Sequence, residues 1–163
     1  VADALKVNNL HDLPLRAVTV AGELKAAQRE LESAKAALAA NKIDGLFENA
    51  QDVDGVKIIT AYFSGTGSDT LRSMCDKIRE KAPNAVAALV GSSDGKTTLA
   101  VTCGKNAQER GLKAGMLVKA IAAVAGGNGG GKPDFAMAGI KDATKVDEAL
   151  AATTDIVRRA LNG

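Results

Sequence analysis

The segment best suited to chemistry spans residues 126–134 and reads Gly-Gly-Asn-Gly-Gly-Gly-Lys-Pro-Asp. Glycine has no Cβ atom, so this backbone exposes its N–H groups and reaches φ angles that other residues avoid. Consecutive exposed amides form a concavity that binds anions, and the Lys132 ammonium adds a positive charge. We therefore predict a phosphate-binding loop, with a flexible linker as the alternative. The candidate phosphate-binding residues here are Gly127, Gly129, Gly130, Gly131, Lys132 and Asp134.

The segment does not match either of two common nucleotide-binding motifs. Gly126 to Lys132 matches the start of a Walker A loop, but Pro133 occupies the position where Ser or Thr should hold Mg²⁺. The predicted order around it is helix, loop and strand, the reverse of what that motif requires. A G-x-G-x-x-G dinucleotide pattern is also missing, because Gly129 and Gly131 are followed by Asp134.

The charged residues near the glycine segment are mostly basic. From Lys96 to Lys132 the chain carries six basic side chains against one acidic side chain, and Lys105 and Lys113 lie in this stretch. A basic stripe beside an anion-binding loop indicates a polyanionic partner, and an ordinary solvated lysine face is the alternative. The chain has one Tyr, three Phe and no Trp. Proteins that bind single-stranded nucleic acid stack its bases on aromatic rings, and this chain has few of them. We therefore expect any nucleic acid to be recognised through its backbone and its shape.

The sequence predicts no catalytic centre and no metal site. His11 is the single histidine, and Cys75 and Cys103 form no C-x-x-C motif. A structural zinc needs about four nitrogen or sulfur ligands. Without a histidine nearby to activate them, both cysteines are predicted to be packing residues rather than nucleophiles. Two free thiols fit a reducing cytosol.

The amino-acid composition further restricts the class of protein. The chain has 163 residues, is 46% hydrophobic and carries a net charge of +2, which is typical of a globular protein with its own core. No apolar run is long enough for a membrane span. The chain starts with Val1 rather than Met, so we expect a piece of a longer protein.

Residues 1–42 are predicted to form a helical coiled-coil or dimerisation segment. Apolar side chains recur at alternating spacings of three and four, which is a heptad pattern over four repeats. A narrow stripe of this kind favours a partner helix, and a helix that packs on its own domain is the alternative. The seam residues assigned to dimerisation are Leu10, Leu13, Val20, Leu24, Leu31 and Leu38.

Residues 43–55 are predicted to be a connector, because Asp44-Gly45 and Asp54-Gly55 are turn signals. Residues 56–163 follow as a globular domain of the α+β class, with a mixed four-stranded sheet flanked by helices. A hairpin turn is expected at residues 92–95. The predicted strands are 56–63, 85–90, 98–102 and 135–140. Ser68 is predicted to cap the first helix of the domain, the second begins near Leu112, and Thr144 with Asp147 resembles a capping box before the last helix.

Three stretches together carry a family resemblance. Residues 126–139 resemble the glycine-rich signature near the C-terminus of alanyl-tRNA synthetases, and residues 111–119 resemble the helix entry that precedes it. The heptad helix with Leu13-Pro14 resembles the segment leading into that region. Met137 stands where this family often has Gln, and Ile140 where a second Gly is common, so any contact made by that Gln is in doubt.

The resemblance implies a DHHA1-type (C-Ala) fold and a non-catalytic role in a cytoplasmic enzyme that attaches alanine to tRNA. It implies that the domain touches the elbow of alanine tRNA, so that aminoacylation and editing act on the same tRNA. It also implies a homodimer formed through the helices. ATP, Mg²⁺ and zinc would serve upstream domains, and this chain would hold no cofactor. We expect neither DNA nor a membrane as a partner.

Two other functions remain open. The glycine signature is shared with the substrate-binding domain of DHH-type phosphoesterases, where the loop would hold a substrate phosphate beside a metal-bearing domain. A coiled-coil adaptor without a ligand is the third hypothesis, but it leaves the five glycines and the terminal Lys-Pro-Asp unexplained. The sequence upstream of the chain would discriminate the first two.

Overall fold

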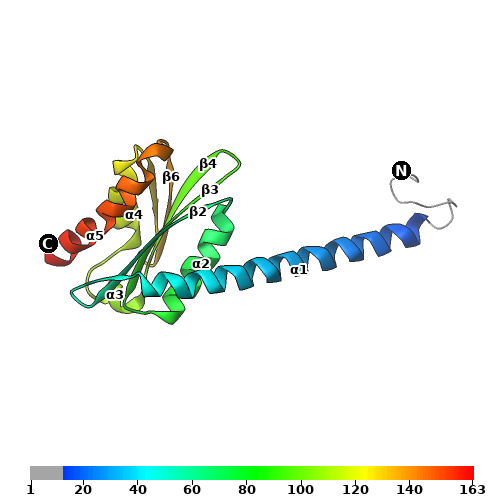
Figure 1. The fold of residues 1–163 in the computed structure, drawn as a ribbon, viewed down its shortest axis with the longest axis horizontal. Coiled ribbons are helices and arrows are strands. Elements are labelled where there is room, and N and C mark those ends of the chain that lie inside the picture. The colour runs from blue at the N-terminus through cyan, green and yellow to red at the C-terminus, as the bar shows by residue number, and fades with distance from the viewer. Residues whose placement is uncertain (1–12) are drawn as a thin grey trace. The chain divides into compact units, whose positions relative to one another are not determined.

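The computed structural model describes residues 13–163, except for the side chains of residues 13–17, 31–33 and 35–41. The chain divides into two compact units, residues 1–41 and 42–163. The elements, labelled in Figure 1, are α1 (Leu13–Glu48), β1 (Gln51–Val53), β2 (Val56–Ser64), α2 (Ser68–Lys81), β3 (Ala85–Ser93), β4 (Lys96–Cys103), α3 (Lys105–Glu109), α4 (Ala114–Val124), β5 (Asn128–Gly131), β6 (Phe135–Ile140), the 3₁₀ turn η2 (Ala143–Lys145) and α5 (Val146–Asn162).

The first unit contains most of α1. Two of its apolar side chains are largely exposed: Val18 by 71% and Leu24 by 59%. Val20 is half-buried. Of the other predicted seam residues, Leu10 lies outside the described residues, as do the side chains of Leu13, Leu31 and Leu38. The dimerisation seam therefore stays a prediction.

Helix α1 continues past the position where the sequence predicts a connector. Asp44-Gly45 lies inside the helix, and the side chain of Ile43 is fully buried. The rest of the predicted connector holds β1, whose hairpin with β2 turns at Asp54-Gly55. Both turn residues have positive φ, 53° and 81°, as a type I′ hairpin requires.

The second unit is built on a mixed six-stranded sheet in the order β1-β2-β3-β4-β6-β5. Only the β2–β3 pair is parallel, and α2 forms its crossover. The α+β class is confirmed, but the prediction of four strands is wrong. The two missed strands, β1 and β5, lie at the edges of the sheet. Neither has the alternating apolar side chains that reveal a strand, since β1 has three residues and β5 reads Asn-Gly-Gly-Gly.

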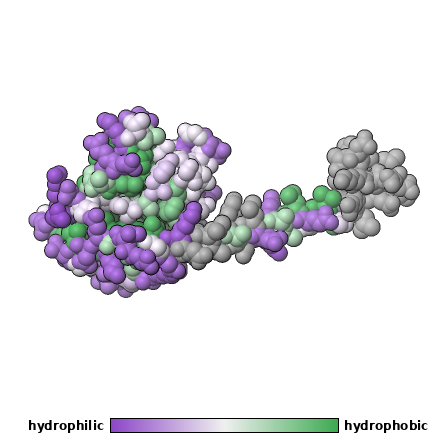
Figure 2. All heavy atoms as spheres, viewed as in Figure 1, coloured by the Kyte–Doolittle hydropathy of each residue, from purple (hydrophilic) through white to green (hydrophobic). Residues whose placement is uncertain are grey.

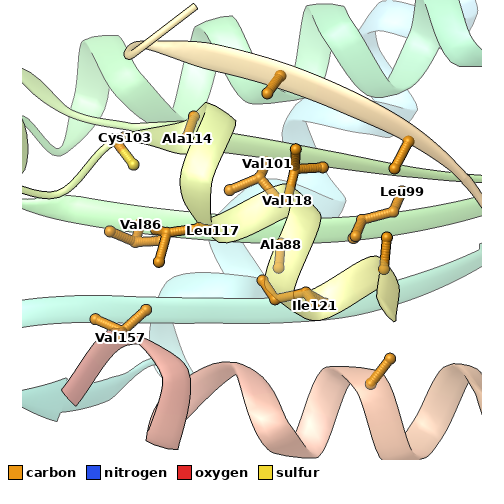
Figure 3. Packing of buried hydrophobic residues seen from close by; sticks show 14 of the residues in the cluster. Val86, Ala88, Leu99, Val101, Cys103, Ala114, Leu117, Val118, Ile121 and Val157 are labelled. Carbon is orange, nitrogen blue, oxygen red and sulfur yellow. The ribbon is translucent and has the colours of Figure 1, made fainter. Parts of the chain in front are cut away.

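The main core lies between the sheet and the helices α4 and α5. Val86 and Val101 point from neighbouring strands toward Leu117 and Ile121 of α4, and Val157 covers the same face from α5 (Figure 3). All five are essentially inaccessible to solvent. Alternate residues of β3 face the two sides of the sheet, both of which are covered, and this explains why the strand is apolar from Ala85 to Val90.

Helix α2 covers the opposite face of the sheet (Figure 1). Its buried stripe consists of Leu71, Met74, Cys75 and Ile78. The helix begins at Ser68 itself, with Gly67 in the N-cap position, so the prediction that Ser68 caps it is displaced by one residue. Hydrophilic residues cover much of the visible surface of this unit (Figure 2). No helix among residues 13–163 is long and apolar enough to span a membrane.

Helix α5 begins later than the sequence predicts. Lys145, not Thr144 of the predicted capping box, occupies the N-cap position, and Thr144 lies in η2 with its N–H bonded to the carboxylate of Asp142. The Thr144 hydroxyl and N–H both donate to Asp142, and these bonds hold the pKa of that carboxyl below its usual range.

Candidate functional site

The glycine segment forms an edge strand rather than a loop. Residues 128–131 are β5, which pairs antiparallel with β6, with Gly129 opposite Ala138 and Gly131 opposite Ala136. Gly126 ends α4 with a φ of 63°, where other residues are strained. Because β5 is the last strand of the sheet, one side of its backbone faces away from the other strands.

Close packing explains three of the glycines. A Cβ atom on Gly129 would lie 2.4 Å from the Cα of Ala138, and one on Gly131 would lie 2.5 Å from the Cα of Ala136. A Cβ on Gly127 would lie 2.3 Å from the carbonyl oxygen of Gly139. These contacts are with backbone, so a side chain could enter only if the strands moved apart. Gly130 has no such restriction, since its nearest neighbour, the Lys119 side chain, would lie 3.7 Å away.

The turn after β5 is held by three other elements. The N–H of Ala114, at the start of α4, donates to the carbonyl oxygen of Pro133 (2.8 Å). The N–H of Cys103 and the hydroxyl of Thr102, both at the end of β4, donate to the carbonyl oxygen of Asp134 (3.0 and 2.9 Å). Helix α2 supplies the third attachment, an ion pair between Arg79 and the Asp134 carboxylate (2.9 Å).

These bonds bring two of the predicted lysines together, and the third lies at the same end of the sheet. Lys132 lies in the turn, and Lys113 precedes the Ala114 that bonds to it, so the two lysines are brought together. Lys105 follows the end of β4 and belongs to the same end of the sheet. All three are exposed. We call Lys105, Lys113 and Lys132 the lysine cluster.

Of the other three basic residues of the stripe, Lys119 lies beside β5, with its side chain next to Gly130. The other two lie elsewhere. Lys96 is at the opposite end of the sheet, where β4 begins beside Ser93. The Arg110 guanidinium donates to the carbonyl oxygen of Asp54 in the β1–β2 turn. The sequence stripe is therefore divided into separate regions by the fold.

Sequence reasoning missed the residues that hold the turn. Arg79 and Thr102 lie 55 and 32 positions from Asp134 in the chain, and no local pattern marks either as its partner. Arg72 of α2 was also missed, and its guanidinium lies over the Phe135 ring at 5.1 Å from the centroid. The crossover of α2 over the sheet brings the two arginines to the turn, whereas Thr102 reaches it from β4.

The two cysteines are not activated. Burial, and to a lesser degree the nearby carboxylate of Asp76, raises the pKa of Cys75 to about 12. Burial, followed by the charge of Asp134, raises the pKa of Cys103 to about 12. Within residues 13–163 no group of three or more His, Cys, Asp or Glu side chains could hold a metal ion.

A separate depression of about 210 Å³ lies between the N-terminus of α2 and the β3–β4 hairpin. It is distinct from the lysine cluster, and its lining consists of Thr66, Gly67, Ser68, Ser93, Asp94, Lys96 and Thr98.

Comparison with known proteins gives a consistent family assignment. The model of the DHHA1 domain matches residues 55–159. The alanine–tRNA ligase of Acetivibrio thermocellus is 37% identical over 163 residues, which is 100% of this chain and 18% of that protein. The alanine–tRNA ligase of Bacillus subtilis is 39% identical over 98% of this chain and 18% of its own length. The chain thus spans less than a fifth of these relatives.

Two solved structures share the fold. The C-Ala domain of Aquifex aeolicus alanyl-tRNA synthetase aligns with a TM-score of 0.61 and 20% identity, covering 67% of this chain and 97% of that domain. A member of the s1p family of ribosomal proteins with a DHH domain aligns with a TM-score of 0.50 and 15% identity, covering 91% of this chain and 35% of the other. At these identities the likeness concerns the fold alone.

Proposed function

The chain belongs to the DHHA1 domain family, and we propose that it is the C-terminal tRNA-binding region of an alanine–tRNA ligase. The proposal is supported by the alignment of all or nearly all of this chain with part of each of two alanine–tRNA ligases. The structural observation that carries it is the lysine cluster, in which Lys113 and Lys132 are held together beside the edge strand β5.

The chemistry of the cluster suits a sugar-phosphate backbone. Ammonium groups on exposed lysines neutralise phosphates without reading the base sequence. The one carboxylate of the turn, on Asp134, is paired with Arg79 and so repels a phosphate less than a free carboxylate would. We therefore expect binding that weakens steeply with salt and discriminates little between tRNAs.

We propose further that the bound region is the elbow of alanine tRNA. A contact there lets the aminoacylation and editing centres of the whole enzyme act on the same tRNA. ATP, Mg²⁺ and zinc would be used by those upstream centres. In this proposal specificity for alanine tRNA comes from outside the chain.

We also propose that α1 contributes to a homodimer. Leu24 of the predicted seam is apolar and 59% exposed, which is compatible with a seam that packs against a partner helix. The relevant measurement is the mass of the chain in solution at several concentrations. A monomer that persists at high concentration would contradict dimerisation through α1 alone.

The test of the main proposal is binding of the 163-residue chain to alanine tRNA and to a non-cognate tRNA across a salt series. Lys132→Glu should weaken binding about tenfold or more, since it replaces a phosphate contact with repulsion. Lys96→Glu is the matched control, because Lys96 is also an exposed lysine but lies at the other end of the sheet. Absence of binding to both tRNAs at low salt would contradict the proposal.

The alternative is the substrate-binding half of a DHH-type phosphoesterase. The structural match to a DHH-domain protein favours it at the level of fold. The sequence relatives described above are alanine–tRNA ligases, which favours the first proposal. If the chain bound a small phosphate ester but no tRNA, the alternative would be preferred.

A further inference from the structure

The turn that carries Lys132 is attached to the rest of the domain by backbone hydrogen bonds and one ion pair. Its backbone accepts hydrogen bonds at Pro133 and Asp134, and the N–H of Lys132 donates to the carbonyl oxygen of Phe135 (2.9 Å). These bonds shape the backbone of the turn. The remaining attachment, from the Asp134 side chain to α2, is the only one of them that depends on charge.

Arg79 divides its guanidinium between two carboxylates. One nitrogen lies 2.9 Å from Oδ2 of Asp134, and the other lies 2.8 Å from Oδ1 of Asp76, one turn earlier on α2. The Arg79 side chain is 30% exposed. Because both ends of its fork are occupied by acceptors, Arg79 is poorly placed to bind a phosphate as well.

We propose that Arg79 and Asp134 form a clamp that positions Lys132 beside Lys113 for binding RNA phosphates. Arg79 holds the Asp134 carboxylate, while Thr102 and Cys103 hold the carbonyl oxygen of the same residue. Asp134 is thereby fixed through both its side chain and its backbone. Arg79 and Asp134 are positioning residues in this inference, which rests on the function proposed above.

A clamp and a purely electrostatic surface predict opposite effects of Asp134→Asn on RNA affinity. Asp134 is a negative charge two residues from Lys132. If charge alone governed binding, Asp134→Asn would strengthen the attraction for RNA. If the clamp positions the lysine, the same variant weakens binding, because a neutral amide holds Arg79 less strongly than the carboxylate does.

The experiment compares the 163-residue chain with Asp134→Asn, Arg79→Gln and Lys132→Gln in binding an alanine tRNA transcript across a salt series. We expect Asp134→Asn and Arg79→Gln each to weaken binding about three- to tenfold. Neither should change the slope of log affinity against log salt by a full unit. Lys132→Gln should reduce the slope by about one, as expected when a phosphate contact is lost.

The matched control is the Arg158–Asp155 pair on α5. It is also an ion pair between an arginine and an aspartate, 3.1 Å apart, but it links residues of one helix. Arg158→Gln and Asp155→Asn should leave tRNA affinity within a factor of two. A double variant, Asp134→Asn with Lys132→Gln, should bind no worse than Lys132→Gln alone.

Tighter or unchanged binding by Asp134→Asn would overturn the clamp. A second measurement decides the matter without RNA, namely hydrogen exchange at the amides of Cys103, Ala114 and Lys132. These amides should exchange faster in Asp134→Asn while the rest of the sheet keeps its protection. Unchanged protection would refute the clamp, whereas failure of the unmodified chain to bind tRNA would refute only the proposed function.

Discussion

The β3–β4 and β5–β6 hairpins each have a lysine at the turn, but different contacts hold the two turns in place. The first turns at Asp94-Gly95 and is followed by Lys96, and the second turns through Lys132, Pro133 and Asp134. At the first turn both central residues have positive φ, 52° and 73°, which is the type I′ geometry favoured by Asp-Gly. A bond between the neighbouring side chains of Ser93 and Asp94 (3.0 Å) adds to it.

The second turn is held by distant parts of the chain. α2, β4 and α4 each bond to Pro133 or Asp134. A turn set by local backbone preference should tolerate changes in its surroundings. A turn set by tertiary contacts should respond to substitutions far away in the sequence, and the following experiments test that difference.

The largest expected difference concerns glycine replacement. Gly131→Ala places a Cβ atom 2.5 Å from the Cα of Ala136 and should cost about 2–3 kcal/mol of unfolding free energy. Gly95→Ala has open space but a φ of 73°, so it should cost about 1 kcal/mol. Urea denaturation of the 163-residue chain measures both. A larger loss of unfolding free energy for Gly95→Ala than for Gly131→Ala would contradict the proposed difference between the two hairpins.

The next effect concerns the hydroxyl that holds the second turn. Thr102 is fully buried and donates to the carbonyl oxygen of Asp134, so Thr102→Val should cost about 1 kcal/mol. The control, Thr97→Val, lies in the same strand but near the first turn and is half-buried. It should stay within about 0.5 kcal/mol in the same denaturation experiment. Equal losses would remove the special role of Thr102.

A pH effect follows from the cysteines, one of which adjoins the second turn. The pKa of Cys103 and that of Cys75 are both raised to about 12, so the folded chain holds protons that an unfolded thiol, with an ordinary pKa of about 8.5, releases. Stability from this source is complete below about pH 8.5 and declines as the pH rises toward 12.

The measurement is the urea midpoint between pH 7 and 10.5, with iodoacetamide labelling beside it. The native chain should label far more slowly at pH 8.5 than the urea-unfolded chain. Asp134→Asn should speed native labelling of Cys103 more than that of Cys75, because the Asp134 charge contributes only to the pKa of Cys103. Equal acceleration at both thiols would indicate general loosening.

The smallest effect is expected at the first turn. Asp94 adopts a φ of 52°, a conformation that Asn tolerates as readily as Asp. Asp94→Asn should therefore shift the midpoint of thermal unfolding by no more than about 2 °C and leave tRNA affinity unchanged. A fall in affinity as large as that expected of Asp134→Asn would mean that the two hairpins do not differ as proposed.

Much of the fold could be predicted because its signals are local. The apolar stripe of α2 and the continuous apolar run of β3 follow from side-chain periodicity. The turn at Asp94-Gly95 follows from the backbone preference of glycine. The edge strand β5 escaped notice because periodicity needs side chains, and its glycines have none.

The candidate site likewise has features that the sequence predicts and features that it does not. The sequence by itself determined which residues are basic, which are glycine and which family the chain resembles, since these are properties of residue type and order. Only the tertiary structure decided that Gly129 and Gly131 are required by contact with β6, and that Asp134 is held by Arg79 from α2. The physical reason is that steric exclusion and ion pairing act through space, between residues whose separation along the chain carries no signal of their contact.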